Sequence, residues 1–253
     1  NVSWENSQNA SATGELLNQK GVKKLYILSL NYAAGKQVVG GIERTYKGNV
    51  VGKDFVPMSH KDWSAELTKI KAAKPDAVIA FYPGSWGPKF FGQYNQAGLN
   101  KTTPLYHVFS VDMGNLPIFQ KNGLNVVNTL QTAQWSPDFD TPHNKKFVRD
   151  FKKKYKMMPN TFASQAYETI MLIKSGVDAV NGDVSKMDKM RAALEKADFK
   201  ALRGTFKYGK EHFPIQDFVA REVVAGSDGK WTLVSRGTVL KNSRAYNYKD
   251  CKR

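Results

Sequence analysis

Short apolar runs alternate with amphipathic stretches along the first half of the chain. The first run, residues 25–30, is too short for a helix and precedes a segment in which Val38, Ile42 and Tyr46 recur at helical spacing. This pattern predicts a buried strand that leads into an amphipathic helix. Further buried strands, separated by helical patterns, are predicted at residues 50–56, 77–82, 105–109 and 126–134.

This alternation predicts an α/β fold. Buried strands that alternate with helices at a spacing of roughly 25 residues are typical of a parallel, doubly wound sheet. In such a sheet, ligands bind beyond the carboxyl ends of the strands. Aromatic side chains follow several of these ends, namely Tyr32, Tyr82, Trp86 and Phe109. Each one alone is more often a core residue, but their shared position favours an apolar ligand pocket.

The pattern changes after residue 135. Residues 136–142 are rich in turn formers and predict a linker, and helical patterns follow at residues 143–155, 161–180 and 185–197 without a strand between them. Such a helical block has no sheet of its own to cover. Strand patterns return at residues 204–208, 218–224 and 231–234, the last two forming a hairpin, and a basic tail begins at Lys241.

The chain is strongly basic, with 38 Lys and Arg against 22 Asp and Glu and a formal charge of +16. This excess is compatible with nucleic acid, an anionic membrane surface or an anionic ligand. The densest cluster, residues 145–156, keeps Phe147, Phe151 and Tyr155 at helical spacing, so its lysines are expected on the outer face of a packed helix. A docking patch for a protein partner stays an alternative, and no nucleic-acid partner is predicted.

The motifs of cofactor sites are incomplete. Gly35 and Gly40 have the spacing of a P-loop, but Gly41 and Ile42 stand where Lys and Ser or Thr are needed. No dinucleotide fingerprint follows a strand, and the four histidines are too scattered for a metal site. We therefore predict no cofactor and no metal. No apolar run approaches the ~18 residues of a membrane span, so no direct membrane insertion is expected.

Ser85 lies in a predicted strand-to-helix turn, where a hydrolase would place its nucleophile. The nucleophile elbow requires glycine at position 83, and this chain has Pro83. Ser85 is therefore expected either to offer its hydroxyl to a ligand or to cap the following helix. With no nucleophile, acid–base pair or metal set, the chain is not expected to be an enzyme.

Taken together, several segments resemble the branched-chain-amino-acid type of periplasmic ABC-transporter solute-binding protein. The similarity runs over nearly the whole chain. The segments that carry it are residues 21–28 and 31–35, Asp62 and Trp63 with Leu67 and Ile70, residues 74–79, Pro159 and residues 166–168.

The resemblance implies the type I periplasmic-binding-protein fold, with two α/β lobes joined by three crossover strands. Residues 1–130 and 202–240 would form the second lobe, residues 135–200 would return to the first, and residues 241–253 would be a C-terminal tail. The opening segment of the family, which supplies the sheet of the first lobe, is not in this sequence. The first lobe is therefore expected to be incomplete.

The resemblance also implies a ligand site at the strand ends. Amino-acid-binding members usually place an acidic residue for the ligand's ammonium in the fourth turn, where this chain has Asp112. If Asp112 points elsewhere, a ligand without an ammonium group is favoured, and the aromatic surround suits an aromatic carboxylate. The residues expected to bind ligand are Tyr32, Ala34, Ser85, Trp86, Ser110, Asp112, Phe162 and Ser164.

The resemblance implies that the protein is extracytoplasmic, in the periplasm, and that it captures a small carboxylate for the membrane permease of an ABC importer. The ligand would be an aromatic acid or a branched-chain or hydrophobic amino acid. A ligand-binding sensor domain on the same fold is the alternative. In relatives that bind aromatic acids, a cysteine near the end pairs with one in the opening segment, which would explain the single cysteine, Cys251.

Overall fold

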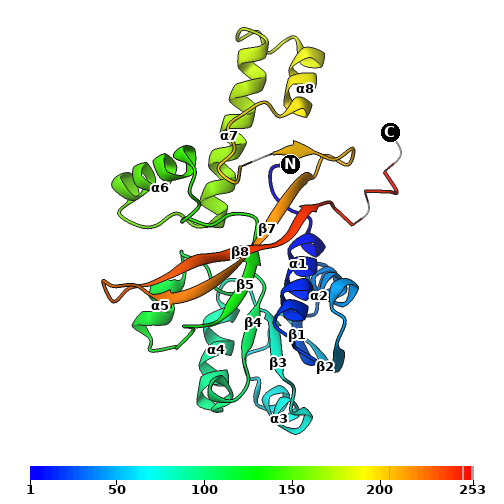
Figure 1. Cartoon of the computed structure of the whole chain (residues 1–253), viewed down its shortest axis with the longest axis vertical. Helices are drawn as coiled ribbons and strands as arrows, with labels where there is room; N and C mark the ends of the chain where they lie inside the picture. Colours follow the sequence, from blue (N-terminus) through cyan, green and yellow to red (C-terminus); the bar gives the residue numbers. More distant parts are fainter. Residues whose placement is uncertain (205, 247, 252–253) are drawn as a thin grey trace.

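Five parallel strands form one side of the sheet in the computed structural model, which describes residues 1–204, 206–246 and 248–251 (Figure 1). Their order in the sheet is β2-β1-β3-β4-β5, with every neighbouring pair parallel. This confirms the predicted parallel α/β sheet. The strands are β1 (Lys24–Leu30), β2 (Asn49–Val56), β3 (Ala77–Phe81), β4 (Leu105–His107) and β5 (Leu130–Ala133).

Helices connect these strands, as the 3.6-residue periodicity predicts. They pack on the two faces of the sheet (Figure 1). Helix α1 (Asn6–Gln19) precedes β1, and the connecting elements are α2 (Ala33–Thr45), α3 (Ser64–Ala73), α4 (Trp86–Gln96), the short 3-10 helix η1 (Leu99–Lys101) and α5 (Leu116–Lys121).

Antiparallel strands extend one side of the sheet. Beside β5 lies β7 (Pro214–Ala225), which pairs with both β6 (Lys207–Tyr208) and β8 (Trp231–Ser243). The predicted hairpin is confirmed, but both of its strands are longer than the pattern indicates. As a consequence, residues 241–243 of the predicted tail belong to β8. Of the predicted strand at 204–208, residue 205 lies outside the described residues.

Two predicted strands are shorter in the structure because the backbone turns. The chain leaves β4 after His107, and Phe109 adopts a left-handed conformation with φ of 55°. Before β5, the N–H of Thr129 donates to the carbonyl of Val126 at 3.1 Å, which closes a turn with Asn128 at φ of 69°. Apolar character alone does not distinguish such turns from strand.

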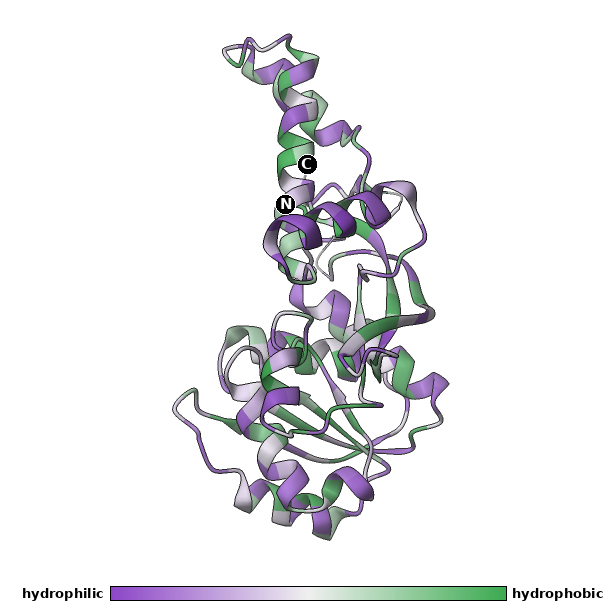
Figure 2. Ribbon diagram, turned by 90° about the vertical axis from the view of Figure 1, so that its left-hand side faces the viewer, coloured by the Kyte–Doolittle hydropathy of each residue, from purple (hydrophilic) through white to green (hydrophobic). Residues whose placement is uncertain are grey.

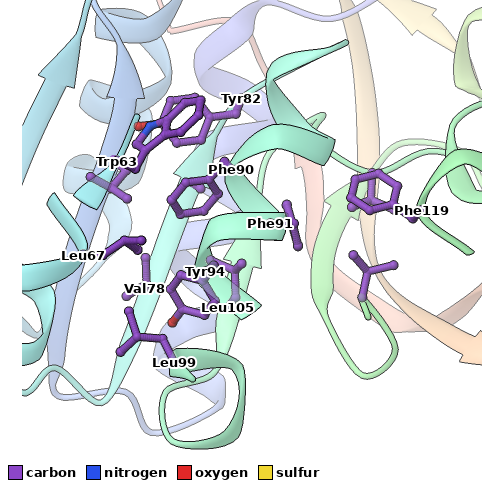
Figure 3. Packing of buried hydrophobic residues seen from close by; sticks show 14 of the residues in the cluster. Trp63, Leu67, Val78, Tyr82, Phe90, Phe91, Tyr94, Leu99, Leu105 and Phe119 are labelled. Carbon is purple, nitrogen blue, oxygen red and sulfur yellow. The ribbon is translucent and has the colours of Figure 1, made fainter. Parts of the chain in front are cut away.

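The two faces of the sheet carry separate hydrophobic clusters. Alternation along β1 sends Leu28 and Leu30 to the face of α3, α4 and α5, and Leu25 and Ile27 to the face of α1 and α2. Figure 3 shows the aromatic packing of the first cluster, in which Trp63 is fully buried. In Figure 2 the strands of the lower part of the molecule are coloured hydrophobic. Burial on both faces explains why these strands read as continuous apolar runs.

The helical block consists of α6 (Pro142–Tyr155), α7 (Thr161–Ala179) and α8 (Met187–Lys196), which lie at one end of the molecule (Figure 1). Its three helices confirm the prediction. One face of α7 remains uncovered, since the exposed fractions of Phe162, Ile170 and Ile173 are 59%, 64% and 44%. None of the helices among the described residues is long and apolar enough to cross a membrane.

Helices α1 and α2 approach each other closely at glycines. A Cβ atom at Gly41 would lie 2.7 Å from both the Cβ of Ala10 and the carbonyl oxygen of Ser7. The neighbouring Gly40 has no such atom within 4 Å. The contact between α1 and α2 therefore requires glycine at position 41 but not at position 40.

We predict that Gly41→Ala lowers the free energy of unfolding by about 1–3 kcal/mol, because the added methyl group forces the two helices apart. The matched control Gly40→Ala should leave stability unchanged or raise it by up to about 1 kcal/mol, since alanine is the better helix former. Urea denaturation followed by circular dichroism measures both. Equal effects of the two substitutions would contradict the proposed packing.

Candidate ligand-binding site

Five aromatic side chains form a continuous strip at the carboxyl edge of the sheet, which we call the aromatic strip. It consists of Trp4, Tyr32, Phe81, Phe109 and Phe162. Tyr32 follows β1, Phe81 ends β3 and Phe109 follows β4, so parallel strands bring these three together. Trp4 precedes α1, and Phe162 lies in the first turn of α7.

The rings contact one another in sequence along the strip. Tyr32 stacks on Phe81 with ring centroids 6.1 Å apart, and Phe81 meets Phe109 edge to face at 6.4 Å. Phe109 stacks on Trp4 at 4.6 Å, and Trp4 lies 6.1 Å from Phe162. Tyr32, Phe109 and Trp4 are half-buried, whereas Phe162 is largely exposed. The strip thus offers an apolar, partly open surface.

Polar contacts to α7 and to Arg203 hold the segment that carries Trp4. The carbonyl of Val2 accepts a hydrogen bond from Arg203 at 2.9 Å, and Arg203 also forms a buried ion pair with Glu168 of α7. Gln165 donates to the hydroxyl of Ser3 at 3.1 Å. Trp4 is therefore fixed between Phe109 and Phe162 by contacts with α7 and residue 203.

The backbone at Phe109 contributes to the position of the strip. A non-glycine residue in the left-handed region is uncommon and costs on the order of 1 kcal/mol. This conformation ends β4 two residues earlier than predicted and accompanies the stacking of Phe109 on Trp4. Local strain at this position is consistent with a functional site.

Helix α2 begins beside the strip without a side-chain cap. Tyr32 occupies its N-cap position, and its side chain makes no capping hydrogen bond. The backbone N–H groups of the first turn, which includes Ala34, are therefore donors next to the aromatic strip. Desolvation by burial raises the pKa of Tyr32, so its phenol stays neutral near pH 7.

Asp112 joins the turn after β4 to the start of α7. Its Oδ2 accepts from the hydroxyl of Thr161 at 3.0 Å and faces the backbone N–H of the same residue at 3.4 Å. Its Oδ1 accepts from the N–H of Gly114 at 3.2 Å. A carboxylate at this position also interacts favourably with the positive end of the helix dipole. Asp112 is thus bound within the protein.

A buried arginine completes this contact. Arg221 of β7 is 2% exposed, and its Nη1 donates to the hydroxyl of Thr161 at 3.3 Å and to the carbonyl of Trp135 at 3.2 Å. Desolvation lowers the pKa of Arg221, while the charges of Asp112 and Asp138 oppose that shift. Arg221, Thr161 and Asp112 form a hydrogen-bonded chain, the clasp, which ties α7 to the sheet.

The structure places two predicted ligand contacts in the interior. Ser110 is fully buried, and its hydroxyl accepts from the N–H of Tyr82 at 3.1 Å. Ser164 is fully buried too, and its hydroxyl donates to the carbonyl of Thr161 at 2.7 Å. Both hydroxyls are committed to the backbone, so we leave the two serines out of the candidate site.

The remaining predicted residues lie at the starts of helices α2 and α4. Ala34 is half-buried in the first turn of α2. Ser85 is exposed at the start of α4, where its side chain makes no capping hydrogen bond. The indole of Trp86 donates to the carbonyl of Met58 at 3.0 Å and packs against the cluster on the α3–α5 face. Trp86 therefore belongs to a different side of the sheet edge from Phe81.

Sequence reasoning missed Trp4 and Phe81 as members of the strip. Phe81 lies within a buried run and reads as a core residue. A signal for Trp4 exists, because it is a lone large aromatic residue in an otherwise polar opening segment. Its partners, however, come from residues 109 and 162, and no local pattern connects them.

Comparison with known sequences identifies the family. Residues 1–230 match the family described as periplasmic binding protein. The chain belongs to this family. A relative from Brucella abortus, named Leu/Ile/Val-binding protein homolog 6, is 27% identical over 244 residues, which are 91% of this chain and 60% of that protein. The chain thus spans about 60% of the length of this relative.

Solved structures of periplasmic binding proteins share the fold of this chain. A solute-binding protein of an ABC transporter from R. palustris, in complex with benzoate, is 32% identical with a TM-score of 0.87, covering 99% of this chain and 68% of that one. A second R. palustris protein, in complex with 4-hydroxybenzoate, has a TM-score of 0.85 at 23% identity, with coverages of 97% and 67%. These similarities confirm the predicted type I fold.

For this periplasmic binding protein, we predict that Asp112 and Thr161 stabilise the fold jointly. Asp112→Ala, Thr161→Val and the double variant form a double-mutant cycle, and the expected coupling energy is about 1 kcal/mol, because each side chain is the other's hydrogen-bond partner. Urea denaturation gives the three free energies. Additive effects would show that the clasp does not contribute as a unit.

Proposed function

We propose that this protein binds a small aromatic carboxylate that carries no ammonium group and delivers it to the permease of an ABC importer from the periplasm. The observation that supports this proposal is the aromatic strip, beside which the carboxylates of Glu5 and Asp112 already accept hydrogen bonds from the protein. Proteins of this kind close two lobes around a ligand. We propose that this chain supplies one of the two walls of that cleft.

The strip suits the ring of an aromatic acid. Aromatic pairs stabilise each other in stacked or edge-to-face geometry at centroid distances of about 4.5–7 Å. Trp4 and Phe162 present rings from different elements, and Phe162 has most of its surface free. An aromatic ligand would extend this array and bury the exposed ring.

The first turn of α2 suits the carboxylate of the ligand. Helix N-termini bind anions through free N–H groups and the helix dipole. Because no side chain caps α2, the N–H groups near Ala34 are the groups we propose for this role. Ala34 has no polar side chain, so it would contribute to binding through its backbone N–H.

Recognition of an amino acid would also require a partner for its ammonium. The two carboxylates closest in sequence to the strip, Glu5 and Asp112, both accept hydrogen bonds from the protein. Glu5 caps α1 through the N–H of Ser7 at 2.9 Å. Because both carboxylates are already engaged by donors of the protein, we infer that benzoate-like acids are preferred over leucine-like amino acids.

We further propose that α6, α7 and α8 belong to a first lobe and the parallel sheet to a second. The exposed apolar face of α7 supports this division, because such faces of helices normally pack on a sheet or another helix. Relatives of greater length have residues available for that purpose. The family consists of transport proteins, so catalysis is not part of this proposal.

The ligand preference can be tested by thermal stabilisation. We expect benzoate and 4-hydroxybenzoate to stabilise the protein, by about 2.7 kcal/mol at a concentration of about a hundred times Kd, and leucine to give no shift at the same concentration. Differential scanning fluorimetry measures the change in Tm. Stabilisation by leucine but by no aromatic acid would refute the proposed selectivity.

The placement of the ligand on the strip can be tested with Phe162→Ala, which should weaken benzoate binding about tenfold because it removes a ring from the site. Ile170→Ala is the matched control, since it truncates another exposed apolar side chain of α7, two turns away from the strip. Isothermal titration calorimetry gives both Kd values. Similar losses in the two variants would mean that Phe162 does not contact the ligand.

A further inference from the structure

A second concave site lies away from the aromatic strip. It has a volume of about 790 Å³ and lies between α5, the end of α6 with residues 156–158, and the turn that joins β7 to β8. Figure 1 shows the turn of this hairpin beside α5, with α6 above both. Ligand pockets commonly have volumes of about 300–1,000 Å³, so this cavity is large enough for a small organic molecule.

The walls of the cavity are mainly apolar. They include the thioethers of Met113, Met157 and Met158, together with Pro117 and the indole of Trp231. Methionine side chains adapt to ligands of different shape, and their sulfur atoms make favourable contacts with aromatic rings. The walls therefore favour the apolar body of a ligand and tolerate variation in its outline.

Polar contacts hold one side of the cavity in place. Gln120 of α5 donates to the carbonyl of Gly229 at 2.6 Å and accepts from the N–H of Trp231 at 3.2 Å. The N–H of Leu233 lies 3.4 Å from the sulfur of Met113. The hairpin is thus fixed against α5, so the wall formed by Trp231 is built into the fold.

The rim of the cavity is positively charged. Lys121, Lys152, Lys156 and Lys230 line it, against one acidic residue, Asp228. The lysine ion pairs among the described residues involve other lysines, at positions 53, 69, 145, 146, 174 and 186. The carboxylate of Asp228 accepts from the backbone N–H of Lys230 at 3.1 Å within its own turn. The rim therefore offers positive charge to a ligand.

We propose that this cavity is a second binding site, for an amphipathic organic anion. The apolar body of the ligand would contact the methionines and Trp231, and its acidic group would lie among the lysines of the rim. This cavity shares no residue with the aromatic strip. It is a separate site with a different chemistry, since its recognition relies on flexible thioethers and side-chain charge.

The position of the cavity links it to the clasp. Met113 directly follows Asp112, and Met158 lies three residues before Thr161. An anion that fills the cavity contacts both chain segments that meet in the Asp112–Thr161 hydrogen bond. The proposed site therefore lies next to the clasp.

The test uses anilinonaphthalene sulfonate, a fluorescent amphipathic anion, titrated into the protein. We expect saturable binding that Lys152→Ala/Lys156→Ala weakens by at least about fivefold, since each charge contributes a fraction of a kcal/mol. The matched control Lys153→Ala/Lys154→Ala removes the same charge from the same helix without touching the cavity, and it should change Kd by less than about twofold.

A second comparison separates this site from the aromatic strip. Phe162→Ala should leave the affinity for the probe unchanged, whether or not the protein binds benzoate. Equal losses of probe affinity in the two double lysine variants would overturn the proposal, because binding would then depend on the net charge of the protein and not on the cavity. Weakened binding in Phe162→Ala would place the probe on the strip, and an absence of saturable binding would rule out the cavity as a site.

Discussion

The clasp of Arg221, Thr161 and Asp112 is the interaction on which the arrangement of the site depends. It joins β7, the first turn of α7 and the turn after β4, which are distant in sequence. A buried arginine is costly unless it is hydrogen-bonded. Arg221 donates from Nη1 to the Thr161 hydroxyl, which in turn donates to Asp112, while the Nε of Arg221 has no hydrogen-bond partner among the described residues. This contact places the start of α7, which carries Phe162, next to the turn after β4.

The same contact bears on the ligand choice proposed above. The turn after the fourth strand is where an acidic residue could receive an ammonium group, but in this chain that carboxylate neutralises the N-terminus of α7. What remains at the sheet edge is an apolar surface of rings beside the uncapped start of α2. Under the proposed function, the side chain that joins α7 to the sheet is therefore the one that an ammonium group would otherwise contact.

The sequence predicted the parallel sheet, the helical block and the hairpin well, since buried runs and 3.6-residue periodicity are local signals. It predicted the candidate site only in part. Tyr32 and Phe162 lie in the strip, whereas Ser110 and Ser164 turned out to be buried and bonded to the backbone. The roles of Trp4 and Arg221 depend on contacts across more than fifty residues, which no local pattern reveals. The left-handed turn at Phe109 was likewise invisible in an apolar run.

The central claim, that an aromatic carboxylate lies on the strip, can be tested most directly by nuclear Overhauser effects between benzoate and the protein in the bound state. The account predicts contacts from the benzoate ring protons to the indole of Trp4 and the ring of Phe162. Contacts to Trp231 and the methyl group of Met157 instead, with none to Trp4, would contradict it.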